Sequence, residues 1–271
     1  MEKFTEKKRY RLTDLVKLVR ILRDPVTGCP WDKEQTHASI RQNMIEEAYE
    51  AAEAIDRDDR DLLCEELGDV LLQVLLHAEI ERQSGGFDLD SIADRLCRKL
   101  ILRHPHIFGT VEVGGSREVL NNWETIKRRE KNHQTGSDAI DDVPHAMPAL
   151  MRSQKVQKRA AYVGFEYAGA DGAVKDLESE VSELKAALAG RGNAAEEIGD
   201  VLFAAVNVAR LTGADAELCA LRSCEKFADR FRVVEWLAKE QGVDLKTAAP
   251  SQMDELWRKA KKHLESVENR E

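Results

Sequence analysis

Apolar residues recur every three or four positions along most of the chain, whereas strict alternation of apolar and polar residues is scarce. A representative run contains Leu62, Leu63, Leu67, Val70, Leu71, Val74 and Leu75. A period near 3.6 residues is typical of helices with one buried face, and a period of two is typical of strands. The pattern therefore predicts an all-α protein.

Glycine and proline residues separate the periodic segments and divide each half of the chain into about five helices. In the first half the expected helices are 12–23, 37–56, 60–83, 90–103 and 116–131. In the second half they are 148–160, 173–189, 193–211, 214–240 and 251–268. A polar stretch before Pro144 is the best linker candidate. The sequence thus predicts two similar helical domains, 1–135 and 148–271, joined by a linker at 136–147.

The two halves share an acidic sequence word. Residues 65–71 read EELGDVL and residues 196–202 read EEIGDVL. Each copy has a second acidic word upstream, Glu47 with Glu50 in the first half and Glu180 with Glu183 in the second. The chain is therefore a tandem repeat that carries four acidic residues on two helices in each half.

The spacing within these words predicts metal sites. Residues three apart lie on nearly one helical face, so Glu47 with Glu50, and Glu66 with Asp69, each present two carboxylates together. Mg²⁺ binds a few carboxylates, keeps waters and takes substrate phosphates as further ligands. Like charges at this spacing, and a glycine such as Gly68 inside a helix, both weaken the helix. Both halves contain both of these destabilising features. A role in metal binding therefore accounts for the acidic residues better than simple solvent exposure does.

Basic and aromatic residues follow the acidic words in the same order in both halves. The aligned residues are Lys99 and Arg103 with Lys226 and Arg230, then Trp123 and Lys127 with Trp257 and Lys261. A spacing of four places each pair on one helical face, and cations beside a metal–carboxylate cluster can hold the outer oxygens of a polyphosphate. For the two tryptophans, core packing and stacking on a ligand are equally compatible with the sequence.

Charge and composition exclude several classes of partner. A formal net charge of -9 argues against binding to nucleic acid or to anionic lipid. No apolar run approaches the length of a membrane span. Five cysteines without a CxxC pair favour neither a disulfide framework nor a zinc site. We expect a cytoplasmic protein without nucleic acid or a membrane as partner.

Together these features resemble the MazG family of tandem-domain nucleoside triphosphate pyrophosphohydrolases, and the resemblance runs nearly end to end. The motifs that carry it are GCPWDKEQT at 28–36, EEAYE at 46–50 with EELGD at 65–69, HPHIFG at 104–109 and LMRSQKVQKRA at 150–160. The resemblance implies hydrolysis of nucleoside triphosphates between the α and β phosphates, with Mg²⁺, or Mn²⁺ as its substitute. It also implies an all-α bundle that forms a homodimer, with four-helix-bundle active sites, and a broad tolerance of the base.

The resemblance also implies residue roles. The implied metal ligands are Glu47, Glu50, Glu66 and Asp69 in the first half, and Glu180, Glu183, Glu197 and Asp200 in the second. The expected catalytic residues are Glu50, Glu183, Lys226, Arg230 and Lys261. The expected substrate-binding residues are Lys99, Arg103, Trp123, Lys127, Trp257, Trp31 and Lys33. In one departure from the pattern, Ser179 stands where the first half has Glu46, which bears on the metal occupancy of the second site.

Three other interpretations are open at this point. Phosphoribosyl-ATP pyrophosphohydrolases and narrower deoxynucleotide hydrolases share the acidic words, but they typically have one domain, and the tandem length argues against them. A regulatory module that binds nucleotide and metal, with one or both halves catalytically silent, is favoured by Ser179. A purely structural helical protein gives no reason for the repeated order of acidic, basic and aromatic residues.

Overall fold

The computed structural model describes residues 4–268, and these residues form helices and turns without a strand. This confirms the all-α prediction. The ten expected helices are α1 (Leu12–Leu22), α2 (Arg41–Asp56), α3 (Arg60–Gln83), α4 (Leu89–Arg103), α6 (Ser116–Glu130), α8 (Ala149–Ala161), α9 (Ala170–Leu188), α10 (Ala194–Leu211), α11 (Ala216–Glu240) and α12 (Pro250–Glu268). The short helices α5 (Pro105–Phe108) and α7 (Gly136–Asp141) and the 3-10 turn η1 (Asp32–Glu34) lie between them.

The start of α2 shows the largest difference from the expected boundaries. Periodicity places the start at residue 37, whereas the helix begins at Arg41. Ahead of it, the Thr36 amide donates to the Ser39 hydroxyl at 3.0 Å, and the Ser39 amide donates to the Thr36 hydroxyl at 3.2 Å. Side chains that bond the local backbone in this way favour a turn over a helix.

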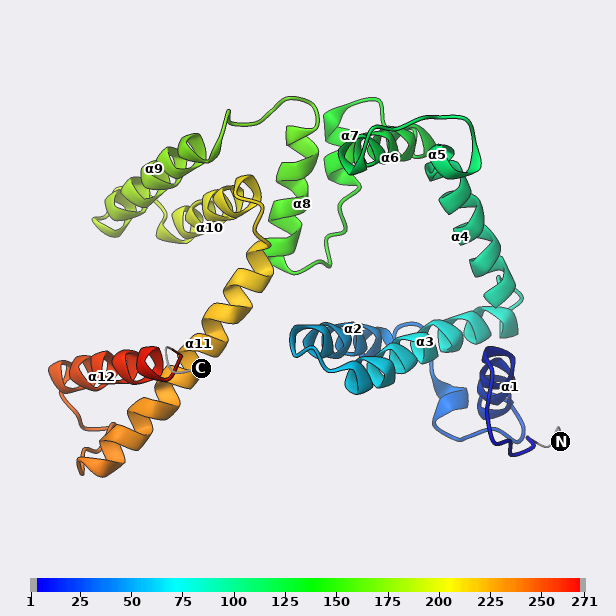
Figure 1. Cartoon of the computed structure of the whole chain (residues 1–271), viewed down its shortest axis with the longest axis horizontal. Helices are drawn as coiled ribbons and strands as arrows, with labels where there is room; N and C mark the ends of the chain where they lie inside the picture. Colours follow the sequence, from blue (N-terminus) through cyan, green and yellow to red (C-terminus); the bar gives the residue numbers. More distant parts are fainter. Residues whose placement is uncertain (1–3, 269–271) are drawn as a thin grey trace. The chain divides into compact units, whose positions relative to one another are not determined.

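The chain divides into two compact units, the first ending at Lys127 and the second beginning at Arg128. The predicted linker, 136–147, contains α7, which packs against α8 within the second unit. The first unit contains the long helical pair α2 with α3, and the second contains two such pairs, α9 with α10 and α11 with α12 (Figure 1). The α2–α3 and α9–α10 pairs contain the acidic words.

The α2–α3 pair is closed by a tight turn. Asp58 adopts a left-handed conformation (φ 52°), and the Asp59 amide donates to the carbonyl of Ala54 at 3.1 Å, which satisfies the end of α2. The Asp59 side chain then accepts hydrogen bonds from the amides of Asp61 and Leu62 and caps the start of α3. This turn brings the α3 acids back alongside α2.

The α9–α10 pair closes in the same way. Gly190 takes the left-handed position (φ 84°), and the Arg191 amide donates to the carbonyl of Ala186 at 3.0 Å. Asn193 caps α10 by accepting from the amide of Ala195 at 3.1 Å. The tandem repeat therefore includes the geometry of the turn. The left-handed conformation costs less free energy for Gly190 in the second copy than for Asp58 in the first.

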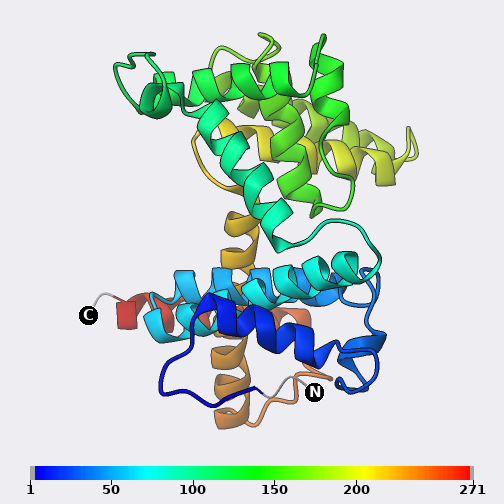
Figure 2. The ribbon, with the colours of Figure 1, turned by 90° about the vertical axis from the view of Figure 1, so that its right-hand side faces the viewer.

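In the first unit, α1 lies against α3 (Figure 2). The buried core between them contains Val19, Ile40, Leu75 and Leu76. Buried Arg23 connects the loop that follows α1 to the end of α3: its guanidinium donates to the Asp32 carbonyl and, at 3.1 Å, to the Gln83 side chain. This network fixes the loop that holds Trp31 and Lys33.

In the second unit, α11 and α12 pack through Val234, Ala238, Leu256 and Ala260, all of which are buried. Within residues 4–268, no helix has both the length and the apolar character needed to cross a membrane.

Candidate metal centres

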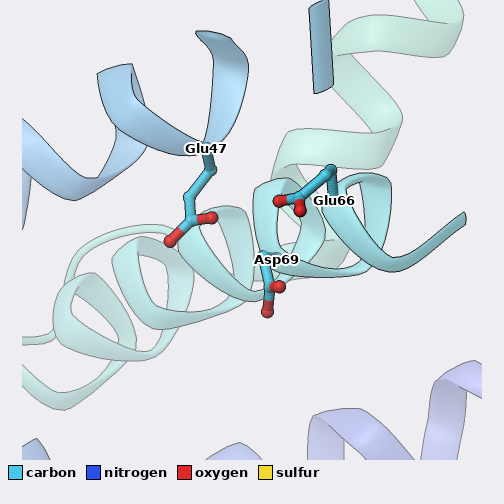
Figure 3. A group of neighbouring side chains, drawn as sticks. All are labelled: Glu47, Glu66 and Asp69. Atoms are coloured by element: carbon cyan, nitrogen blue, oxygen red, sulfur yellow. The ribbon is translucent and has the colours of Figure 1, made fainter. Parts of the chain in front are cut away.

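Three carboxylates of the first unit converge between α2 and α3. Glu47 extends from α2, and Glu66 and Asp69 extend from neighbouring turns of α3 (Figure 3). One ligand atom from each of the three lies within 4.8 Å of the others. The Glu50 carboxylate lies close enough to raise the pKa of both Glu47 and Glu66. All four predicted acids of the first half are therefore in one cluster.

The second unit builds a similar cluster between α9 and α10, but with a different inner set. Here Glu180, Glu183 and Glu197 place ligand atoms within 4.8 Å of one another. Asp200 repels both Glu180 and Glu197 electrostatically from the next turn of α10. All four predicted acids of the second half are again close together, with Asp200 outside the inner three.

The electrostatics of both clusters favour a cation. Loss of solvent, followed by repulsion from neighbouring carboxylates, raises the pKa of Glu47, Glu66, Glu180 and Glu197. Among residues 4–268, no lysine, arginine or histidine forms an ion pair with any of the eight acids. Convergent oxygen ligands without a counter-ion fit Mg²⁺ or Mn²⁺, which prefer carboxylates and waters.

The raised pKa values predict a pH-dependent stability. Metal-free Glu66→Gln protein is expected to melt at a higher temperature than the wild type at neutral pH, because the substitution removes repulsion in the cluster. A carboxyl whose pKa is raised by folding stabilises the fold fully below its ordinary pKa, about 4.3, and loses that contribution as the pH rises through the raised value. The difference in melting temperature between the variant and the wild type therefore shrinks as the pH falls from neutral to about 4.3.

In saturating Mg²⁺ the wild type is expected to melt at a higher temperature than Glu66→Gln, because the ion stabilises the intact cluster and the variant binds it less well. Thermal unfolding in chelator and in Mg²⁺, across this pH range, measures both effects. Exposed Glu65, next to Glu66 but outside the inner cluster, provides the matched control Glu65→Gln, for which we expect much smaller differences. Melting temperatures that do not respond to Mg²⁺ would contradict a metal site.

Two residues of α9 modify the second cluster. Ser179 donates a hydrogen bond to the Glu183 carboxylate at 3.4 Å, so the serine contacts the cluster although it replaces an acid. Asp176, which the motif comparison missed, repels Glu180 and accepts a hydrogen bond that raises the pKa of Tyr167. Asp176 lies four residues before Glu180, and this spacing is the sequence signal that identifies it. The aligned residue in the first half is Asn43.

The aligned arginine and tryptophan residues contact each other in both units. The Arg103 guanidinium lies 5.3 Å from the centre of the Trp123 ring, and that of Arg230 lies 6.0 Å from the centre of the Trp257 ring. Both distances are typical of cation–π contacts. Both tryptophans are half-buried, so each has packing partners within its own unit. The HPHIFG motif forms α5, beside which His104 packs edge-on against Trp123.

The predicted lysines and arginines do not reach the carboxylate clusters within the described chain. Lys99, Lys226 and Lys261 are exposed, and none of them forms an ion pair with a cluster acid in residues 4–268. Lys127 is half-buried. In the loop around η1, Trp31 is exposed and Lys33 is half-buried. The structure therefore brings the acids together and leaves the basic groups apart from them.

Comparison with known proteins identifies the family. A model of the MazG nucleotide pyrophosphohydrolase domain matches residues 35–108, which include the first carboxylate cluster. A nucleoside triphosphate pyrophosphohydrolase of Escherichia coli strain K12 is 41% identical over 252 residues, which cover 92% of this chain and 96% of that protein. The chain belongs to the MazG family.

The match to MazG proteins extends over both units. The nucleoside triphosphate pyrophosphohydrolase/pyrophosphatase MazG of Thermotoga maritima is 40% identical over 248 residues, 92% of this chain and 94% of that protein. The uncharacterized protein YabN of Bacillus subtilis is 44% identical over 247 residues, which are 90% of this chain but 50% of that protein. The resemblance predicted from the motifs is confirmed, and it includes the second carboxylate cluster.

Proposed function

We propose that this chain hydrolyses ribo- and deoxynucleoside triphosphates between the α and β phosphates, releasing a nucleoside monophosphate and pyrophosphate, with Mg²⁺ bound at the carboxylate clusters. The observation that carries the proposal is the convergence of three carboxylates within 4.8 Å in each unit. The class of enzyme, a nucleotide pyrophosphohydrolase acting on acid anhydrides, follows from membership of the MazG family.

The acidic residues of each cluster have different proposed roles. In the first unit Glu47, Glu66 and Asp69 would hold Mg²⁺, which when bound neutralises phosphate charge and activates water. Glu50, whose carboxylate lies beside Glu47 and Glu66, is placed to orient the attacking water or to accept its proton. Glu183, which aligns with Glu50, belongs to the inner three carboxylates of the second unit and accepts a hydrogen bond from Ser179, and we propose the same role in catalysis for it.

The cations would bind the substrate's outer phosphates. Lys226, Arg230 and Lys261 carry positive charge, which the departing pyrophosphate requires as its negative charge develops. Because they do not reach the acids within the described chain, we propose that a second copy of the chain supplies them. A homodimer would assemble each site from two chains.

The surfaces of the acidic helices support this homodimer. Several large apolar side chains on the two helical pairs are exposed: Met44, Ile55, Leu67, Leu188, Ile198 and Leu202. A Cβ atom added at Gly68 or Gly199 meets nothing within 4 Å, which leaves room for a closely packed helix. A second helical pair would cover these residues and form a four-helix bundle around each cluster. Light scattering measures the expected dimer mass.

A substrate panel tests the proposed reaction. We expect Mg²⁺-dependent release of pyrophosphate from ribo- and deoxynucleoside triphosphates, and little release in chelator, because the clusters need a cation to bind phosphate. Pyrophosphate and orthophosphate are measured separately. Release of orthophosphate alone would contradict cleavage at the α–β bond. No release, with nucleotide binding retained, would instead favour the regulatory module.

A further inference from the structure

A large cavity lies within the second unit, between α7, α8, α9 and α10 and the loop that joins α8 to α9. Its volume is about 920 Å³. Apolar and aromatic side chains form most of its wall, among them Val156, Phe165 and Phe203. Both the size and the lining are those of sites that bind small organic molecules, which span roughly 300–1,000 Å³.

One buried amide oxygen in this wall lacks a hydrogen-bond partner among the described residues. Gln157 on α8 is 5% exposed, and its Nε2 donates to the backbone carbonyl of Phe203 at 2.8 Å. A carbonyl oxygen can only accept, so this bond fixes which end of the amide faces Phe203. The Oε1 of Gln157 is buried and, among the described residues, has no hydrogen-bond donor. A buried acceptor left unpaired costs free energy, which a ligand N–H would recover.

The cavity adjoins the second carboxylate cluster. Asp176 lines the cavity and also repels Glu180. On the facing helix, Ala204 lines the cavity one turn after Asp200. A single ligand can therefore place charged groups at the cluster and an apolar, nitrogen-bearing group in the cavity. A nucleoside triphosphate has this division between phosphates and base.

We propose that the cavity holds the nucleobase of the substrate that binds to the second unit. The Oε1 of Gln157 accepts a hydrogen bond from an N–H group on the Watson–Crick edge of this base. This inference rests on the proposed function. Adenine and cytosine carry an amino group on that edge, and guanine, uracil and thymine carry a ring N–H. One fixed acceptor therefore accommodates all the common bases and disfavours a base that lacks an N–H.

The test compares binding of two ligands that differ in one amino group, α,β-methylene-ATP and the α,β-methylene triphosphate of purine riboside, in the presence of Mg²⁺. Neither can be cleaved at the α–β position, so binding is measured without turnover. The full chain carries Glu66→Gln, which weakens the first site. When Gln157 is intact, we expect α,β-methylene-ATP to bind at least about 10-fold more tightly than the purine riboside analogue.

Gln157→Met keeps the length of the side chain and removes the acceptor, so the two ligands are expected to bind equally. The matched control is Gln154→Met: Gln154 lies one turn earlier on α8, and its amide is already satisfied by the backbones of Ala214 and Ala216. This control is expected to keep the preference. Unchanged binding of Mg²⁺-tripolyphosphate reports that the Gln157→Met protein is folded.

The outcomes separate the inference from the proposed function. Equal binding of the two ligands to the chain with Gln157 intact, or a preference that survives Gln157→Met, overturns the base-reading role even if pyrophosphate is released from natural substrates. A preference that Gln157→Met abolishes supports that role even if the substrate panel shows no turnover.

Discussion

Replacing Glu66 and Glu197 together by glutamine is expected to lower Mg²⁺-dependent pyrophosphate release by roughly 100-fold or more. Each residue belongs to the inner three carboxylates of its cluster, one in each unit. Glutamine keeps the shape of the side chain but removes a charged metal ligand, and metal ions provide most of the charge neutralisation in phosphoryl transfer. Initial rates of pyrophosphate release over a range of Mg²⁺ concentrations measure the loss.

The single variants assign the reaction to a unit. If only Glu66→Gln or only Glu197→Gln lowers the rate, the affected unit carries the turnover and the other unit is silent. Glu65→Gln and Glu196→Gln are matched controls, because they remove the same charge one residue away, from side chains that are exposed and outside the inner clusters. We expect both controls to retain most of the activity. A double variant with wild-type turnover would rule out the clusters as the catalytic centres.

Lys226→Met is expected to lower kcat/KM for nucleoside triphosphates by roughly 10- to 100-fold, the size of one lost hydrogen bond between charged groups. Lys226 is exposed on α11 and forms no ion pair within the described residues, so the melting temperature should stay unchanged. The matched control is Lys239→Met, an exposed lysine near the end of the same helix, which should retain the wild-type kcat/KM. Steady-state kinetics together with thermal unfolding separate a loss of substrate binding from a loss of folding.

Mixing two impaired variants tests which chain of the dimer supplies the cation. If a second copy of the chain supplies Lys226, a mixture of Lys226→Met and Glu197→Gln chains regains activity, because some mixed dimers contain one intact site. If both residues of a site come from one chain, the mixture shows only the average activity of the two variants. Wild-type kcat/KM in Lys226→Met itself would show that this lysine does not bind the substrate.

The sequence by itself determined the helices and the acidic faces. Helical periodicity and the spacing of three between Glu47 and Glu50 are local properties of 3.6 residues per turn, so they can be read without knowing any neighbour. The order of the repeated words in the two halves was equally visible. The short helix α7 was missed, because it spans only Gly136–Asp141 within a polar stretch and is too short to show a period.

Only the tertiary structure decided how the helices meet. The turns at Asp58 and Gly190 set the alignment of each helical pair, and this alignment places Asp69 inside the first inner cluster. Its counterpart Asp200 lies outside the second, whereas Glu183 lies inside it. The contact of Arg230 with Trp257 and the unpaired oxygen of Gln157 likewise depend on neighbours from other helices. Spacing along one helix fixes the face on which a residue lies, but distances between helices depend on packing, which a single sequence does not display.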